Sequence, residues 1–290
     1  MYDICCVGHL TSDKIVNTQR VMYMPGGTAL YFSCAMNKLD ISYILVTALA
    51  PAEMHYVADL RKKGIEVKVQ PSAHTVVFEN IYADNQDERT QNVLQKADPF
   101  TMEQLLQVEA KIFHLGPLLA DDFSADFIKA LSGRGQIALD AQGYLRKVVN
   151  QKVYLTDWPD KKKTLQYIDI LKADVAELAT LTGCKTVADG VAFLADLGVK
   201  EAVITNGSMG SVIYSDGIFY EIAAYRPKTV VDATGCGDTY MAGYLYQRIK
   251  GAGIQASGEF AAAMAGLKTT SPGPFAGTAD EVMQFLRDNA

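Results

Sequence analysis

The chain has 290 residues and a formal charge of −6, with 49% apolar and 21% charged residues. This balance argues against disordered and fibrous classes, and the length suits one α/β domain over residues 1–290. The negative charge and the absence of any run of five basic residues argue against nucleic acid and anionic membrane surfaces as partners.

Neither a membrane helix nor a disulfide framework is predicted. The apolar, uncharged stretch Ile41–Ala52 is shorter than the roughly 18 to 20 residues that span a bilayer. The N-terminus carries Asp3 and no basic residue before Lys14, so we expect a cytoplasmic chain without a secretory signal. Five cysteines without CxxC spacing predict reduced thiols.

The first quarter of the chain alternates predicted strands and helices. An apolar strand over Tyr2–Val7 ends at Gly8, and Pro25-Gly26-Gly27 opens a helix that runs to about Leu39. A strand over Ile41–Leu49, a helix over Ala52–Lys63 and a strand over Ile65–Val69 follow. This βαβ order predicts a parallel sheet.

Between Thr75 and Val93 the pattern changes to two-residue alternation, interrupted by the turn-like segment Asp84–Asp87. This pattern predicts a hairpin that interrupts the βαβ order.

The βαβ order then resumes, and several predicted strands end in a glycine or a carboxylate. Ligands of open parallel sheets bind outside the carboxyl ends of the strands. We therefore expect Asp140 and the residues after Thr205 to lie at the edge of the sheet where a ligand binds. The predicted strands are Ile112–Leu115, Gln136–Asp140, Ile168–Leu171, Ala202–Thr205 and Ser211–Tyr214, and the predicted helices are Asp122–Leu131, Val187–Leu197, Gly237–Ile249, Ala256–Thr269 and Thr278–Arg287.

The segment Val230–Gly243 reads as an apolar strand that enters a glycine-spaced turn and then a helix. Gly235 and Gly237 allow backbone amides at the helix N-terminus to face an anion such as phosphate. The alternative is a tight turn in which Asp238 only caps the helix. The chain has no GxxxxGK[ST] motif, and Tyr240 stands where GxGxxG needs its third glycine.

The run Asp232-Ala233-Thr234-Gly235-Cys236-Gly237-Asp238 resembles the D-[TP]-T-G-A-G-D signature of the ribokinase/PfkB family of sugar and nucleoside kinases. The resemblance implies an α/β fold: a ribokinase-like three-layer α/β/α body with a mostly parallel central sheet and a small β-strand lid at about residues 14–24 and 75–95. It implies that Asp238 is the catalytic base and that Gly235, Cys236 and Gly237 form the anion hole, and a general base at Asp238 is consistent with its place at a helix start.

Further segments resemble the family in the same chain order. The first-strand segment of the family is similar to Gly8–Asp13, where the alternative is that Asp13 is simply exposed to solvent. The family's di-glycine hinge is similar to Gly26-Gly27, where the alternative is a turn before a helix. Asp140-Ala141-Gln142-Gly143 stands where the family often has D-x-N or D-x-Q-G. The substrate-binding residues implied are Asp13, Gly26, Gly27, Asn80, Arg89, Asp140, Gln142 and Asp238.

The segment Thr205–Gly210 resembles the T-x-G-x-x-G nucleotide turn, although a glycine hairpin loop would look alike. The implied nucleotide-binding residues are Thr205, Gly207, Gly210, Thr234, Gly235 and Gly237. In the family's N-x-x-E motif, Asp174 replaces the Asn and Glu177 is kept, which implies that Glu177 binds Mg²⁺ through water. ATP and Mg²⁺ are the implied cofactors, and a monovalent cation would involve carbonyls near Asp232 and the loop 271–277.

The expected activity is ATP-dependent phosphorylation of a hydroxyl, with a hydroxymethyl group of a sugar as in fructokinases as the first choice. The Asp140–Gly143 segment keeps a nucleoside or inositol-type kinase open as the alternative. A non-catalytic sugar-binding regulator on the same fold is a third interpretation, which Asp238 argues against. A small sugar or polyol is the expected partner. The sequence does not show whether two chains pair, but an exposed lid edge would favour a homodimer through the lid.

Cys236 has two interpretations. It is a small spacer in the turn, or a reactive thiol whose pKa the helix N-terminus lowers.

Overall fold

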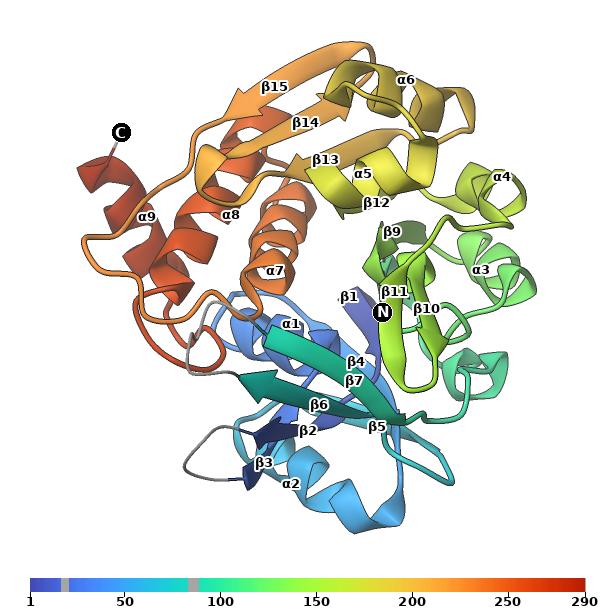
Figure 1. Cartoon of the computed structure of the whole chain (residues 1–290). Helices are drawn as coiled ribbons and strands as arrows, with labels where there is room; N and C mark the ends of the chain where they lie inside the picture. Colours follow the sequence, from blue (N-terminus) through green and yellow to red (C-terminus); the bar gives the residue numbers. More distant parts are fainter. Residues whose placement is uncertain (17–20, 83–88, 290) are drawn as a thin grey trace.

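The computed structural model describes residues 1–16, 21–82 and 89–289. Its body is a nine-stranded sheet with the order β15-β14-β13-β12-β9-β8-β1-β4-β5 (Figure 1). The strands are β1 (Tyr2–Gly8), β4 (Tyr43–Leu49), β5 (Glu66–Pro71), β8 (Ala110–Gly116), β9 (Gln136–Asp140), β12 (Ile170–Asp174), β13 (Glu201–Thr205), β14 (Ser211–Ser215) and β15 (Ile218–Ile222).

All neighbours from β13 to β5 pair in parallel, and β14 pairs antiparallel with both β13 and β15. The prediction of a mostly parallel sheet is confirmed, and the predicted strand limits differ from the observed ones by at most three residues. The strands β1, β9, β12 and β13 therefore end at one edge of the sheet, where Gly8, Asp140, Asp174 and Thr205 lie.

Helices cover both faces of this sheet (Figure 1). One apolar core lies under α1 (Thr28–Met36), α2 (Met54–Lys62), α7 (Cys236–Ile249), α8 (Ile254–Lys268) and α9 (Ala279–Asp288). A second core lies on the opposite face under α3 (Ala125–Ser132), α5 (Val175–Thr182) and α6 (Val187–Asp196), with the short α4 (Lys161–Thr164) beside α3. The body therefore has three layers, as a ribokinase-like α/β fold does.

A second, six-stranded sheet, the small sheet, has the order β10-β11-β7-β6-β2-β3. Its strands are β2 (Thr11–Val16), β3 (Val21–Gly26), β6 (Val77–Tyr82), β7 (Arg89–Gln95), β10 (Arg146–Val149) and β11 (Lys152–Leu155). The predicted hairpin corresponds to β6 and β7, and its predicted turn at Asp84–Asp87 lies outside the described residues, as do positions 17–20 of the predicted lid segment 14–24. Phe78 and Val93 pack with Val76, Leu118 and Leu119 into a third core under this sheet.

Two predicted elements are wrong in detail. Val230 and Val231 are irregular and exposed rather than in a strand, because this segment lies against the residue after α8, where the Val231 amide donates to Thr269 O at 2.7 Å. The third helix begins at Ala125 rather than Asp122, because the Ser124 side chain caps it.

In the part of the chain that the structure describes, no single helix is long and apolar enough to cross a membrane. Helices α5 and α6 pass that test only as a pair bent by 54°, and both contribute to the second core.

Candidate active site

A buried charge cluster lies at the carboxyl ends of β9 and β12. Lys172 stands opposite Asp140 in the strand register, and its Nζ lies 2.9 Å from Asp140 Oδ2 and 3.9 Å from Glu177 Oε2. All three side chains are buried. Gln142 joins the cluster through its Nε2, which donates to Glu177 Oε1 at 3.1 Å. The sheet thus brings together Asp140, Gln142 and Glu177, which were predicted to serve the substrate and the metal.

The charges in this cluster stabilise one another. Burial alone would lower the pKa of Lys172, but the carboxylates of Asp140 and Glu177 outweigh it and hold that pKa above its ordinary value. Burial raises the pKa of Glu177 despite the nearby ammonium. A cation that stays protonated is therefore fixed at the centre of the site.

The glycine-spaced turn lies beside this ammonium. Gly235 precedes α7 with φ of 75°, a conformation that favours glycine, and a side chain there would also collide with the ring of Tyr31. A Cβ at Gly237 would lie 3.2 Å from Lys172 Nζ, so the ammonium lies against the first turn of α7. The free amides of a helix N-terminus and a lysine charge are therefore adjacent, which suits a phosphoryl group.

Asp238 occupies the first turn of α7 and is half-buried. Burial, followed by the charge of Asp140, raises its pKa from 3.8 to about 7, while Lys172, a hydrogen bond from Thr28 and the charge of Arg146 lower it. A carboxylate with a pKa near neutral pH is well matched to general-base catalysis.

Asp13 lies in β2 beside the start of α1. Its Oδ1 accepts a hydrogen bond of 2.7 Å from Thr11 Oγ1, and a side chain at Gly26 would collide with its carboxylate. Gly27 has φ of 85°, and a Cβ there would lie 2.5 Å from His9 O. Gly26 is therefore required for close packing against Asp13, and Gly27 for close packing against His9, which places the three predicted residues in one region.

Asn80 lies in β6 opposite Ile15 of β2, and the two-residue period puts it on the same face as Asp13. The Asn80 side chain is buried, and its Oδ1 accepts from Gln91 Nε2 at 3.1 Å. Arg89 is the first residue of β7, and its side chain is outside what the structure describes.

The predicted nucleotide turn connects β13 to β14 and lines a cavity of about 290 Å³. Thr205, Gly207 and Gly210 contribute from this turn, and Cys236 and Gly237 contribute from α7. The rest of the wall is mostly apolar, with Ala224, Pro227, Ala262 and Ala265 among its residues. Thr234 lies just before α7, and its amide donates to Asp232 Oδ1 at 2.8 Å.

Asp174 caps α5 rather than facing the phosphate turn directly. Its Oδ1 accepts from the Glu177 amide at 2.7 Å, and Glu177 Oε2 accepts from the Asp174 amide at 2.8 Å, which is a capping box. Carboxylates of this kind suit Mg²⁺, which prefers oxygen ligands and keeps several of its waters. Among the described residues, no group of three or more His, Cys, Asp or Glu could hold a metal ion by itself.

The reactive-thiol interpretation of Cys236 is wrong. Burial raises the pKa of this thiol to about 11, despite the nearby charge of Lys268, so the thiol stays protonated near neutral pH. Cys236 is a small residue that packs in the turn, where its Sγ lies 3.7 Å from Ala265 O.

Sequence reasoning missed three residues around Asp238: Thr28, Arg146 and Lys172. Lys172 had a signal, because a lysine inside the apolar run Ile170–Ala173 is unusual for a central strand. Arg146 lies near Leu118 O and 5.9 Å from the centre of the Phe78 ring, and it comes from β10, which alternation did not predict.

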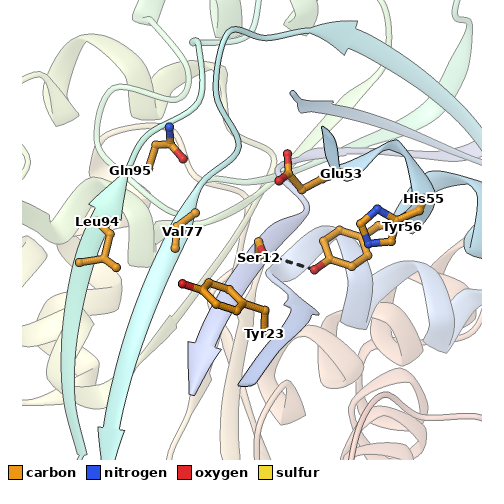
Figure 2. A pocket seen from close by; sticks show the side chains of 8 residues that line it. All are labelled: Ser12, Tyr23, Glu53, His55, Tyr56, Val77, Leu94 and Gln95. Atoms are coloured by element: carbon orange, nitrogen blue, oxygen red, sulfur yellow. Dashed lines mark hydrogen bonds between the residues drawn. The ribbon is translucent and has the colours of Figure 1, made fainter. Parts of the chain in front are cut away.

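A larger hollow of about 720 Å³ lies on the face of the small sheet that is opposite to Asp13 and Asn80 (Figure 2). Tyr23, Val77 and Leu94 line it from the strands, and Glu53 and Tyr56 line it from the start of α2. Because strand residues alternate between faces, this hollow lies opposite Asp13 and Asn80. We call this side the outer face.

The family model for pfkB family carbohydrate kinases matches residues 1–280. The chain belongs to this family. Cytidine kinase from Thermococcus kodakarensis is 25% identical over 84% of this chain and 88% of its own length. Probable fructokinase-2 from Arabidopsis thaliana is 26% identical over 91% of this chain and 87% of its own length.

Solved structures of the ribokinase family are similar over nearly the whole chain. A pyrophosphate-dependent kinase, solved with a pyrophosphate analog and myo-inositol, has a TM-score of 0.86 and 29% identity over 97% of this pfkB kinase and 99% of its own chain. Arabidopsis thaliana ribokinase, solved with ribose and ATP, has a TM-score of 0.83 and 21% identity over 99% of both chains, which supports the fold alone.

Proposed function

We propose that this kinase transfers the γ-phosphate of ATP to a hydroxyl of a small polyol. The observation that carries the proposal is the Asp238 carboxylate, whose pKa is raised to about 7, in the first turn of α7 beside the Lys172 ammonium. A binding module would not need a base of this kind next to an anion-binding turn.

In the proposed reaction, the face of the small sheet that bears Asp13 and Asn80 orients the acceptor. Asp238 accepts the hydroxyl proton while the acceptor oxygen forms its bond to the γ-phosphorus and the bond to the ADP oxygen breaks. The amides of Gly235, Cys236 and Gly237 stabilise the charge on the transferred oxygens, and Lys172 adds a fixed positive charge. Glu177 would hold Mg²⁺ through water, and the bound metal would supply positive charge against the phosphates.

The apolar cavity supports ATP as the donor. It adjoins the turn of α7, and its wall of alanine and proline side chains offers a nucleobase the apolar surface that ligand pockets use. Pyrophosphate is the second candidate donor, because a similar solved kinase is named as pyrophosphate-dependent. Pyrophosphate would leave this apolar cavity unused.

For the acceptor, we favour a cyclic polyol of the myo-inositol type over fructose. The structure solved with myo-inositol is 29% identical over 97% of the chain, a larger similarity than that to the fructokinase. Asp13 and the Asn80–Gln91 pair provide carboxylate and amide oxygens that suit ring hydroxyls.

The test is a matrix of donors and acceptors. Purified enzyme with Mg²⁺ receives ATP or pyrophosphate, and myo-inositol, fructose, ribose or cytidine, and product phosphate esters are quantified by mass spectrometry. We expect ATP with myo-inositol to give the highest kcat/KM. Ala262→Leu narrows the cavity, so it should raise the KM for ATP and leave a pyrophosphate-driven reaction unchanged. Turnover with pyrophosphate but not with ATP would overturn the donor assignment. Turnover with fructose, ribose or cytidine but not with myo-inositol would overturn the acceptor assignment.

We also propose that the small sheet acts as a lid and that its outer face pairs with a second copy of this chain. Tyr23 and Leu94 line the outer hollow and are 60% and 36% exposed, and Val21 and Tyr154 are 57% and 51% exposed on the same sheet. A cluster of large exposed apolar side chains on one sheet is typical of protein interfaces.

The pairing predicts a dimer in size-exclusion chromatography with light scattering. The double variant Tyr23→Glu/Leu94→Glu should elute as a monomer, because it places charges in the contact. Leu106→Glu, at an apolar residue of the body that is 67% exposed, is the matched control and should stay dimeric. A monomeric wild-type chain would contradict the pairing.

A further inference from the structure

Lys268, at the end of α8, is a fully buried lysine outside the cluster described above. Its Nζ donates to the main-chain oxygen of Asp232 at 2.7 Å and lies 3.1 Å from Asp232 Oδ2. A buried charge is costly unless it is paired, so these two contacts are essential for placing this side chain.

Asp232 is the residue that begins the motif with the anion turn. Its Oδ1 accepts the amide of Thr234 at 2.8 Å, and its Oδ2 accepts the amide of Gly273 at 3.2 Å. The Lys268–Asp232 pair therefore joins three segments: the end of α8 through Lys268, the residues that lead into α7 through Asp232, and the loop after Ser271 through the Gly273 amide on Asp232.

The ammonium also lies close to the turn itself. Lys268 Nζ is 6.0 Å from the centre of the Tyr31 ring, and the same ring packs against Gly235. Burial raises the pKa of the Asp232 carboxyl, but hydrogen bonds from Thr234 and the Lys268 ammonium outweigh it and hold that pKa below its ordinary value. The fully buried ammonium and the partly exposed carboxylate thus form an ion pair beside the turn.

A bound monovalent cation does not fit these residues. The family resemblance implies carbonyls near Asp232 and the loop 271–277 as its ligands. In this chain, the Asp232 carbonyl and carboxylate already receive the Lys268 ammonium. A second cation at these oxygens would be repelled by the first.

We infer that the Lys268 ammonium is a built-in cation that holds Asp232 and the anion turn in place, so that this kinase needs no monovalent metal ion. Lys268 is a positioning residue, because it acts on the phosphoryl group through the turn. Its effect on turnover rests on the proposed kinase function, whereas its effect on cation binding does not.

The test compares Lys268→Ala, which removes the charge and opens space, with Lys268→Met, which removes the charge and keeps the space filled. Wild-type turnover should be equal in potassium, sodium and tetramethylammonium chloride at one ionic strength. Lys268→Ala should lose about 100-fold in kcat/KM for the donor without potassium, the scale of a misplaced catalytic geometry. Potassium or ammonium should restore much of this loss and raise the melting temperature. Lys268→Met should be impaired and unresponsive to either ion.

Lys250→Ala is the control, because Lys250 pairs with the fully exposed Asp40 and should leave every readout unchanged. Potassium dependence of the wild-type enzyme would overturn the inference. If Lys268→Met has wild-type turnover and Lys268→Ala does not respond to potassium or ammonium, then Lys268 only fills space and the inference is wrong. If no acceptor is phosphorylated, the potassium-dependent shift in melting temperature of Lys268→Ala alone still decides the inference.

Discussion

Replacing Asp238 by Asn is expected to lower kcat by roughly 10²- to 10⁴-fold, while ATP still binds with nearly wild-type affinity. The amide keeps the shape of the side chain and its place in the first turn of α7, but it cannot accept a proton from the acceptor hydroxyl. Turnover is measured by coupled ADP release, and ATP binding by calorimetry. Turnover close to that of the wild-type enzyme would contradict the role of Asp238 as the base.

The pH dependence gives a second readout of the same residue. Because the pKa of Asp238 is raised to about 7, the base is protonated below this pH, and kcat/KM should rise through pH 7 and then level off. Asp238→Asn should lose this rise.

Stability should change in the opposite direction. A carboxyl whose pKa in the folded protein exceeds its ordinary 3.8 contributes stability at low pH, and this contribution is lost as the pH rises to about 7. The melting temperature of Asp238→Asn relative to wild type should therefore be higher at pH 8 than at pH 5. Equal differences at both pH values would mean that Asp238 has an ordinary pKa.

The parts of the site that sequence could predict are those encoded in short segments. The turn from Gly235 to Asp238 combines glycines with a helix start, so its ability to bind an anion can be predicted from a short segment, although the distant residues that hold it in place cannot. The end of β9 at Asp140 was also predictable, because the apolar run stops at a carboxylate. The residues at these places were predictable, whereas the raised pKa of Asp238 depends on tertiary contacts that short segments do not encode.

The small sheet was harder to predict from hydrophobic alternation. Strand β2 reads Thr-Ser-Asp-Lys-Ile-Val, with polar residues on both faces, because Asp13 faces the site while Lys14 pairs with Glu79 at 2.8 Å. The prediction of a strand at Val230–Val231 failed for the opposite reason. These residues are apolar like those of a buried strand, but the Val231 amide donates to Thr269 O, just after α8, and not to a neighbouring strand.

Lys172→Met is expected to affect both stability and chemistry. Removal of the ammonium leaves the buried carboxylates of Asp140 and Glu177 without their cation, which should lower the free energy of unfolding by about 3 to 5 kcal/mol. Denaturant unfolding measures this loss. Lys200→Met is the matched control, because Lys200 pairs with Asp169 at 2.6 Å but is 72% exposed, and such pairs contribute about 0 to 1 kcal/mol.

The chemical effect of Lys172→Met is separable from its effect on folding. The Lys172 charge lowers the pKa of Asp238, so its removal should shift the rise of kcat/KM to higher pH, whereas a loss of folded enzyme would reduce activity equally at every pH. The ammonium also lies against Gly237 in the anion turn, so kcat should remain low even where Asp238 is fully ionised. A pH profile that keeps its wild-type midpoint would show that Lys172 supports the fold without contributing to the electrostatics of phosphoryl transfer.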